Sequence, residues 1–210
     1  MVGLALVATS AVAAPTRASS ADYIESVQRR GWNKAGALEL SPFAGYGLND
    51  PFLIRGGAGL RVVWWPRALV GLTVEASGWT QTPSEAARIA QRELKAELRQ
   101  TGSGWALLAG AEVSAIDGKL AFGKRLVPFE IVLRGLIGGE TSTEDIHSGP
   151  TLALAAAIGA RFFLSPAWGL ETAFAWRSAS LEREIDGRLV PGRDTVVSFQ
   201  VGFPLRFGGW

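Results

Sequence analysis

The fold of this chain is decided by the stretch Val197-Ser198-Phe199-Gln200-Val201-Gly202-Phe203-Pro204-Leu205-Arg206-Phe207. Every second residue in it is large and apolar, and the residues between are polar or small. A period of two is typical of a β-strand that has one apolar and one polar face. This strand alone leaves open which face points outward.

The same alternation recurs along the chain and predicts eight strands, at residues 37–47, 55–65, 68–79, 104–115, 127–138, 151–164, 168–178 and 194–207. One face of these strands is apolar and almost uncharged. The opposite face carries five acids and five bases, which are Glu39, Arg61, Glu75, Glu112, Glu130, Arg134, Arg161, Glu171, Arg177 and Arg206.

Ten charges on one face argue against an ordinary soluble core, because an unpaired buried charge is strongly unfavourable. An apolar wall that faces lipid and encloses paired charges satisfies both faces. The sequence therefore predicts an all-β protein, an eight-stranded antiparallel transmembrane β-barrel in the outer membrane of a Gram-negative bacterium. Eight strands leave just enough interior for side chains. We therefore expect the ten charges to form an interior ion-pair network that plugs the barrel.

The composition agrees with a barrel and excludes other classes of protein. No apolar run reaches the roughly 18 residues that a membrane-spanning helix needs. The 26 glycines suit a curved sheet, and the 8 tryptophans suit aromatic girdles at the membrane surfaces. A net charge of +2 is too small to predict binding to nucleic acid. With no Cys and one His, we expect no metal site and no cofactor.

Three segments are expected along the chain. Residues 1–21 are rich in Ala and contain small-x-small sites such as Ala11-Val12-Ala13, so they resemble a secretory signal peptide that is removed. A disordered Ala-rich tail is the alternative interpretation. Residues 22–36 are charged and predict a periplasmic N-terminal arm, and residues 37–210 make up the barrel.

The connections alternate between short and long, as periplasmic turns and external loops do in outer-membrane barrels. Tight turns are expected around Pro66 and at Ser165-Pro166, and longer loops at 48–54, 80–103, 139–150 and 179–193. Both chain ends are then periplasmic. The fourth connection, 116–126, is long on the short side and carries Lys119, Lys124 and Arg125. Together with the arm, it is the prime candidate for contact with an unknown periplasmic or envelope-complex protein.

The third connection contains the sequence Thr82-Pro83-Ser84-Glu85, which predicts the start of a helix capped at Thr82 and ending near Gln100. One stripe of this helix is basic, and its opposite face holds Ala86, Ala90, Leu94 and Leu98. The stripe is either a contact for outer-membrane lipid and lipopolysaccharide phosphates or an ordinary solvated face. Its candidate residues are Arg88, Arg92, Lys95 and Arg99.

The C-terminal strand also fits the pattern by which the barrel-assembly machinery recognises a last strand. The pattern is polar-x-Gly-x-x-apolar-x-apolar, and here it falls on Gln200, Gly202, Leu205 and Phe207. An unpaired strand edge of this kind can dock on another edge before the barrel closes.

Catalysis by a lipid-modifying enzyme is the third interpretation that we considered. The single histidine, His147, lies beside Ser148 and near Glu144 and Asp145 in a loop that ends in Gly149-Pro150. A catalytic triad needs its base within reach of the nucleophile and oriented by the acid, which adjacent loop residues rarely achieve. We therefore expect no enzyme.

Several segments resemble the myxobacterial outer-membrane β-barrel family. They are Val27-Gln28-Arg29-Arg30, Leu38-Glu39-Leu40-Ser41-Pro42, Leu48-Asn49-Asp50-Pro51-Phe52, Gly118-Lys119-Leu120-Ala121-Phe122 and Val127-Pro128-Phe129-Glu130-Ile131-Val132-Leu133. Some members of that family accompany envelope-spanning complexes, including gliding-motility machinery. The resemblance implies a structural anchor or docking component of an envelope complex. A narrow, porin-like pore is the alternative.

Overall fold

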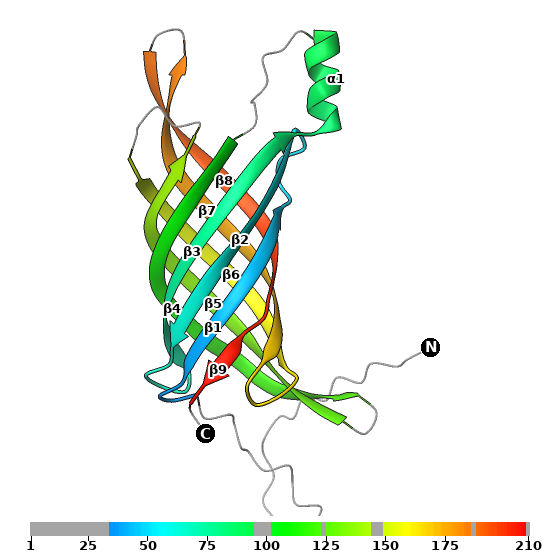
Figure 1. Ribbon diagram of the computed structural model, residues 1–210, viewed down its shortest axis with the longest axis vertical. Helices are drawn as coiled ribbons and strands as arrows, with labels where there is room; N and C mark the ends of the chain where they lie inside the picture. The colour runs from blue at the N-terminus through cyan, green and yellow to red at the C-terminus, as the bar shows by residue number, and fades with distance from the viewer. Residues whose placement is uncertain (1–33, 95–101, 123–124, 144–148, 186–187, 209–210) are drawn as a thin grey trace, which may run out of the picture.

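Alternation of apolar and polar residues builds the strands of the computed structural model, which describes residues 34–94, 102–122, 125–143, 149–185 and 188–208 (Figure 1). One helix, α1 (Glu85–Leu94), lies between the third and fourth strands. The strands are β1 (Leu38–Gly47), β2 (Leu53–Trp64), β3 (Val70–Pro83), β4 (Gly102–Phe122), β5 (Arg125–Ser142), β6 (Thr151–Phe163), β7 (Gly169–Ile185), β8 (Arg188–Gly202) and β9 (Leu205–Phe207).

Each strand from β1 to β7 pairs antiparallel with the next one, and β1 closes the ring by pairing with β8 and β9 on its other side. The strands β8 and β9 together fill one position in the ring, and we call each of the eight positions a stave. This last stave is interrupted at Pro204, because proline has no N–H to donate to a neighbouring strand. Hydrogen bonds continue on both sides of the break: the N–H of Phe203 donates to the carbonyl of Pro42, and that of Arg206 to the carbonyl of Ala167. The protein is therefore an eight-stranded barrel, as the sequence predicted.

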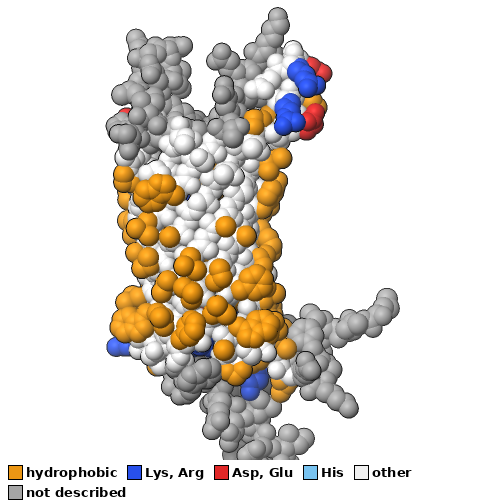
Figure 2. All heavy atoms as spheres, in the orientation of Figure 1, with side chains coloured by type: hydrophobic (Ala, Val, Ile, Leu, Met, Phe, Trp, Pro, Cys, Tyr) orange, Lys and Arg blue, Asp and Glu red, His pale blue; other side chains and the backbone are white. Residues whose placement is uncertain are grey.

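The outer wall of the barrel is apolar. Large hydrophobic side chains point outward from all eight staves, among them Leu72, Leu107, Ile158 and Phe174, each about half exposed. Figure 2 shows these side chains over the wall, most densely on its lower half. Such a surface is stable only against lipid, because water would meet a large continuous apolar area.

Two expected loops are strands in the structure, and the boundaries given for them were wrong. The fourth connection, expected at 116–126, is a hairpin in which β4 and β5 stay paired from Ile116↔Ile131 to Phe122↔Arg125. The seventh, expected at 179–193, is largely the pairing of β7 with β8. In both places the alternation is weakened by charged residues, which are compatible with a strand once neither face has to meet lipid.

The helix begins later than expected. Thr82 and Pro83 belong to β3, and Ser84 is the N-cap, since its Oγ accepts a hydrogen bond from the backbone N–H of Ala87. Ala87 is fully buried, whereas Ala86 is exposed, so the packed face of α1 is turned by one residue from the expected one. No helix within the described residues is long and apolar enough to cross a membrane.

Candidate functional site

The lumen of the barrel is filled by charged side chains in the half nearer to Lys34 and to the end of β9. The start of β1, the strand β9 and the short turns lie at this end (Figure 1), which is the periplasmic end in outer-membrane barrels. We call the filled region the ionic plug. It contains five acids and five bases, which are Glu39, Glu75, Glu112, Glu130 and Glu171 with Lys34, Arg61, Arg134, Arg161 and Arg206.

Arg161 on β6 is the centre of the plug and is completely buried. Its guanidinium lies 2.7 Å from Glu171, 2.6 Å from Glu112, 2.9 Å from Glu39 and 3.2 Å from Glu130. These carboxylates come from β7, β4, β1 and β5, so one side chain joins four other strands. Arginine suits this position because its planar guanidinium carries five N–H donors and stays charged.

Glu171 on β7 is the acidic counterpart of Arg161. Besides that contact, it accepts a 2.7 Å hydrogen bond from Arg61 and a 3.0 Å hydrogen bond from Arg134. Arg61 lies on β2 and Arg134 on β5, so these bonds cross the lumen rather than follow the wall. These contacts across the lumen block the barrel at the level of Glu171.

Five ion pairs of the plug join residues that face each other directly on neighbouring strands. Because directly opposed residues share a face, each strand pair brings its own acid and base together inside. The pairs are Arg61↔Glu75, Glu112↔Arg134, Glu130↔Arg161, Arg161↔Glu171 and Glu39↔Arg206. Five of the strand pairings in the ring are thus marked by opposite charges.

Lys34 closes the periplasmic end of the plug and was not anticipated from the sequence. It precedes β1, forms a buried ion pair with Glu130, and lies 4.0 Å from the centre of the Trp65 ring. Burial is the main influence on its ammonium and lowers its pKa, although the Glu130 carboxylate opposes that shift. No alternation reaches Lys34, since it lies outside a strand, so no sequence signal could have found it.

Above the plug, towards the external end, the lumen opens into a vestibule lined by a second group of charges. Arg55 pairs with Asp194 at 2.8 Å and donates two hydrogen bonds to Gln81. The indole N–H of Trp79 donates to Glu140 at 2.9 Å. Arg55 and Glu140 point inward like Arg61 on β2 and Arg134 on β5. Arg55 is the first residue of the strand expected at 55–65, and Glu140 lies two residues beyond the one expected at 127–138, so the same alternation could have found both.

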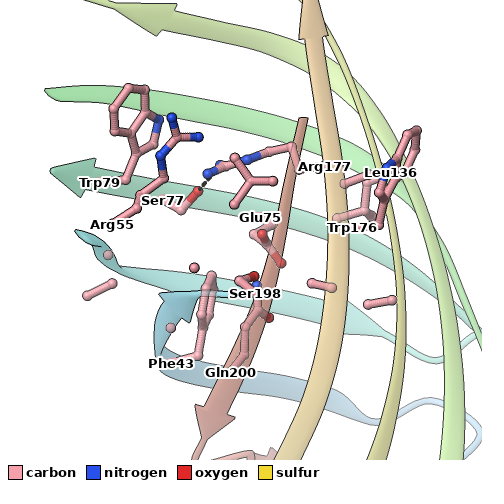
Figure 3. Close-up of a pocket in the computed structure, with 18 of the residues that line it drawn as sticks. Phe43, Arg55, Glu75, Ser77, Trp79, Leu136, Trp176, Arg177, Ser198 and Gln200 are labelled. Carbon is pink, nitrogen blue, oxygen red and sulfur yellow. Dashed lines mark hydrogen bonds between the residues drawn. The ribbon is translucent and has the colours of Figure 1, made fainter. Parts of the chain in front are cut away.

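Arg177 belongs to this vestibule and not to the plug, unlike the other nine of the ten charges expected inside. Its guanidinium lies 3.4 Å from Glu140. It also donates a 3.4 Å hydrogen bond to the hydroxyl of Ser77 (Figure 3). It borders a cavity of about 60 Å³ that is lined at its floor by Glu75, Arg134 and Gln200. This volume is enough for a few water molecules.

The four residues of the expected assembly signal lie on the closing stave. Gln200 points inward and accepts a hydrogen bond from Arg61, and Gly202 is buried opposite Phe43. Leu205 and Phe207 point to the lipid side and pair with β1. The stave that carries the pattern is therefore the one that seals the ring.

Of the basic stripe expected for lipopolysaccharide contact, Arg88 and Arg92 are exposed on α1 at the external end. Arg88 lies 3.8 Å from Glu85 of the same helix turn. Lys95 and Arg99 lie outside the described residues, as do the expected signal peptide (1–21), most of the arm (22–36) and the loop residues Glu144, Asp145 and His147. Within the part of the chain that the structure describes, no cluster of acids and histidines could hold a metal ion.

No family model and no curated protein matches the sequence. Among solved structures, the chain is similar to Ail, the attachment invasion locus protein of Yersinia pestis, with a TM-score of 0.43 and 13% identity over 82% of this chain and 99% of that one. With the outer membrane protein OprG of Pseudomonas aeruginosa, the TM-score is 0.49 and the identity is 12%, over 84% of this chain and 98% of that one. With a major outer membrane protein of Thermus thermophilus, the TM-score is 0.40 and the identity is 13%, over 81% of this chain and 99% of that one.

These likenesses concern the fold alone, and the class of the protein follows from its own geometry. The ring is closed, its outer wall is apolar, and its charges are inside. It is a small outer-membrane β-barrel.

Proposed function

We propose that this outer-membrane barrel acts as a closed structural anchor, a docking component of an envelope complex, and does not conduct solutes. The observation that carries the proposal is the ionic plug. A ring of eight strands has little free interior, and here that interior is occupied by side chains that bind one another across it.

Opening a path through the plug would require separating buried charges. Arg161 holds carboxylates of four other strands, and Glu171 holds guanidiniums of three. Removing a partner from a buried pair costs about 3–5 kcal/mol, so spontaneous opening of the lumen is rare. This argues against the narrow pore that the sequence left as an alternative.

The docking role is supported by the periplasmic end of the barrel. There β4 and β5 extend beyond the rest of the ring (Figure 1) and carry Lys119 on the exposed surface. The residues that follow in sequence, Lys124 and Arg125, add further positive charge. The resemblance to the myxobacterial outer-membrane barrel family, some of whose members accompany envelope complexes and gliding machinery, points to the same role.

Two experiments test the two halves of this proposal. In planar bilayers, we expect the purified barrel to show no single-channel conductance, and a reproducible conductance would establish the pore instead. In cells, we expect deletion of residues 120–125 to leave folding intact and to abolish co-purification of envelope proteins. The control is the double variant Arg88→Glu/Arg92→Glu at the external end, which should co-purify normally. Unchanged co-purification after the deletion would refute the docking role.

A further inference from the structure

The strands β4 and β5 form a hairpin that projects past the ring at the periplasmic end (Figure 1). The partner strand β3 follows β4 only as far as Val113, and β6 follows β5 no further than Phe129. Beyond these points β4 and β5 pair only with each other among the described residues. We call residues 116–122 and 125–131 the periplasmic hairpin.

The hairpin is held in a fixed position by its base. The ring of Phe129 lies over Gly118 on the paired strand, where a Cβ would meet Cε1 of that ring at 2.6 Å. The same ring lies 6.5 Å from the ring of Phe162 on β6. A bulge between Ser114 and Ile116 turns β4 away from β3 at this point. The hairpin is therefore preformed for binding, which lowers the entropy lost when a partner orders on it.

The two outer edges of the hairpin differ in what they can bind. The free edge of β5, Arg125–Pro128, is four residues long and includes a proline, which cannot donate to a ladder and commonly protects a strand edge. The free edge of β4, Ile116–Phe122, has seven residues and no proline. Within the described residues no strand pairs with it, so its outward N–H and C=O groups are open to a partner.

Side chains along the open edge of β4 show what kind of strand would fit there. Ile116, which is 58% exposed, and Leu120 lie on one face, and Lys119 is exposed on the other. Glu130 is buried in the plug, where it pairs with Lys34 and Arg161. The other charges between residues 116 and 131 are one acid, Asp117, and three bases, Lys119, Lys124 and Arg125, so this segment has an excess of positive charge outside the plug. Two copies of the hairpin joined edge to edge would bring these positive charges together, which disfavours a second copy as the occupant.

We infer that the edge Ile116–Phe122 binds an extended, acidic segment of a periplasmic protein as an additional β-strand. This inference rests on the docking role proposed above and names its mode and the chemistry of the partner. Seven residues span about 23 Å at 3.3 Å per residue, and every second one offers both an N–H and a C=O to the added strand. Main-chain bonds supply affinity, and an acid opposite Lys119 with apolar residues beside Leu120 supplies specificity.

The test uses the full barrel in lipid nanodiscs and a capped synthetic peptide, Thr-Glu-Val-Glu-Val-Glu-Thr. Hydrogen exchange at the amides of 116–122 is measured with and without the peptide. We expect exchange to slow by about tenfold at a peptide concentration ten times its Kd, with no change at Leu126 and Val127. Two control peptides, one with Lys in place of Glu and one N-methylated at alternate residues, should give no protection.

The variant Lys119→Glu should bind the acidic peptide about fivefold more weakly, as expected for an exposed charge pair, and should fold normally because this side chain is exposed. The inference is overturned if the acidic peptide gives no protection at 116–122, if the lysine peptide protects equally, or if only the β5 edge is protected. Should the deletion of 120–125 still abolish co-purification in those cases, the docking role stands and only strand addition is refuted. If the peptide gives no protection and the deletion also leaves co-purification unchanged, docking at this end is refuted as well.

Discussion

Replacing Arg161 by methionine tests the central residue of the plug. The substitution removes the charge and keeps most of the side-chain length. Each of its four carboxylate partners retains another cation: Glu39 keeps Arg206, Glu112 keeps Arg134, Glu130 keeps Lys34, and Glu171 keeps Arg61 and Arg134. The plug is then left with five acids and four bases, so one buried negative charge has no compensation.

The expected cost is that of one uncompensated buried charge and not of four broken pairs. Removing one partner from a buried ion pair lowers the free energy of unfolding by about 3–5 kcal/mol. We expect this loss in urea unfolding of the detergent-solubilised barrel, followed by tryptophan fluorescence. Heat-dependent mobility in SDS provides a second readout, since a folded barrel resists SDS until it is heated.

Two further variants make the interpretation specific to charge balance. The double variant Arg161→Met/Glu112→Gln restores an equal number of acids and bases, and should recover part of the lost free energy. The variant Arg88→Met removes an exposed arginine and should be neutral. The charge-balanced plug is refuted if Arg161→Met unfolds at the same urea concentration as the parent. It is also refuted if the loss of free energy of unfolding in the double variant equals the sum of the losses in the two single variants.

Four other predictions follow from single features of the barrel. Gly110→Ala should destabilise the barrel by about 1–3 kcal/mol, because its Cβ would lie 2.0 Å from the carbonyl oxygen of Gly135, whereas Gly135→Ala, with open space around it, should be neutral in the same urea titration. Leu107→Arg on the lipid face should cost about 2–4 kcal/mol, and a neutral result would mean that this side does not meet lipid. Lys34→Met also leaves the plug with five acids and four bases, but burial lowers the pKa of the Lys34 ammonium, so this cation stabilises the folded barrel less; the variant should lower the unfolding midpoint by less than Arg161→Met does. Arg134→Leu should also destabilise the barrel, since it leaves Glu112 and Glu171 short of a cation, and an unchanged melting temperature would contradict the inward placement of Arg134.

The barrel could be predicted from the sequence because its two faces differ in composition along every strand. In the strand from Val197 to Phe207, apolar side chains of even spacing point to lipid and the residues between point inward, and this needs no tertiary information. The same phase places Arg61, Arg134 and Arg161 inside. What the phase cannot give is which acid each arginine meets across the lumen, because that depends on the stagger of the closed ring.

Other features depend on contacts that no local pattern records. Lys34 lies inside because the turn at Ala35 and Gly36, with Gly36 at φ +80°, directs the chain into the barrel mouth. The hairpin of β4 and β5 was expected to be a loop because its charged residues interrupt the apolar alternation. The cap of α1 moved from Thr82 to Ser84 because pairing with β2 keeps Thr82 in β3, so tertiary pairing overrode the local signal.

The directly opposed ion pairs have a consequence for how the barrel is assembled. Side chains alternate along a strand, so a slip of one residue between two strands turns one whole set of inward residues towards lipid. For β6 against β7, such a slip would separate Arg161 from Glu171 and turn a charged side chain towards lipid, which is unfavourable. The opposed charges therefore favour one alignment of neighbouring strands over the alignments that differ from it by one residue.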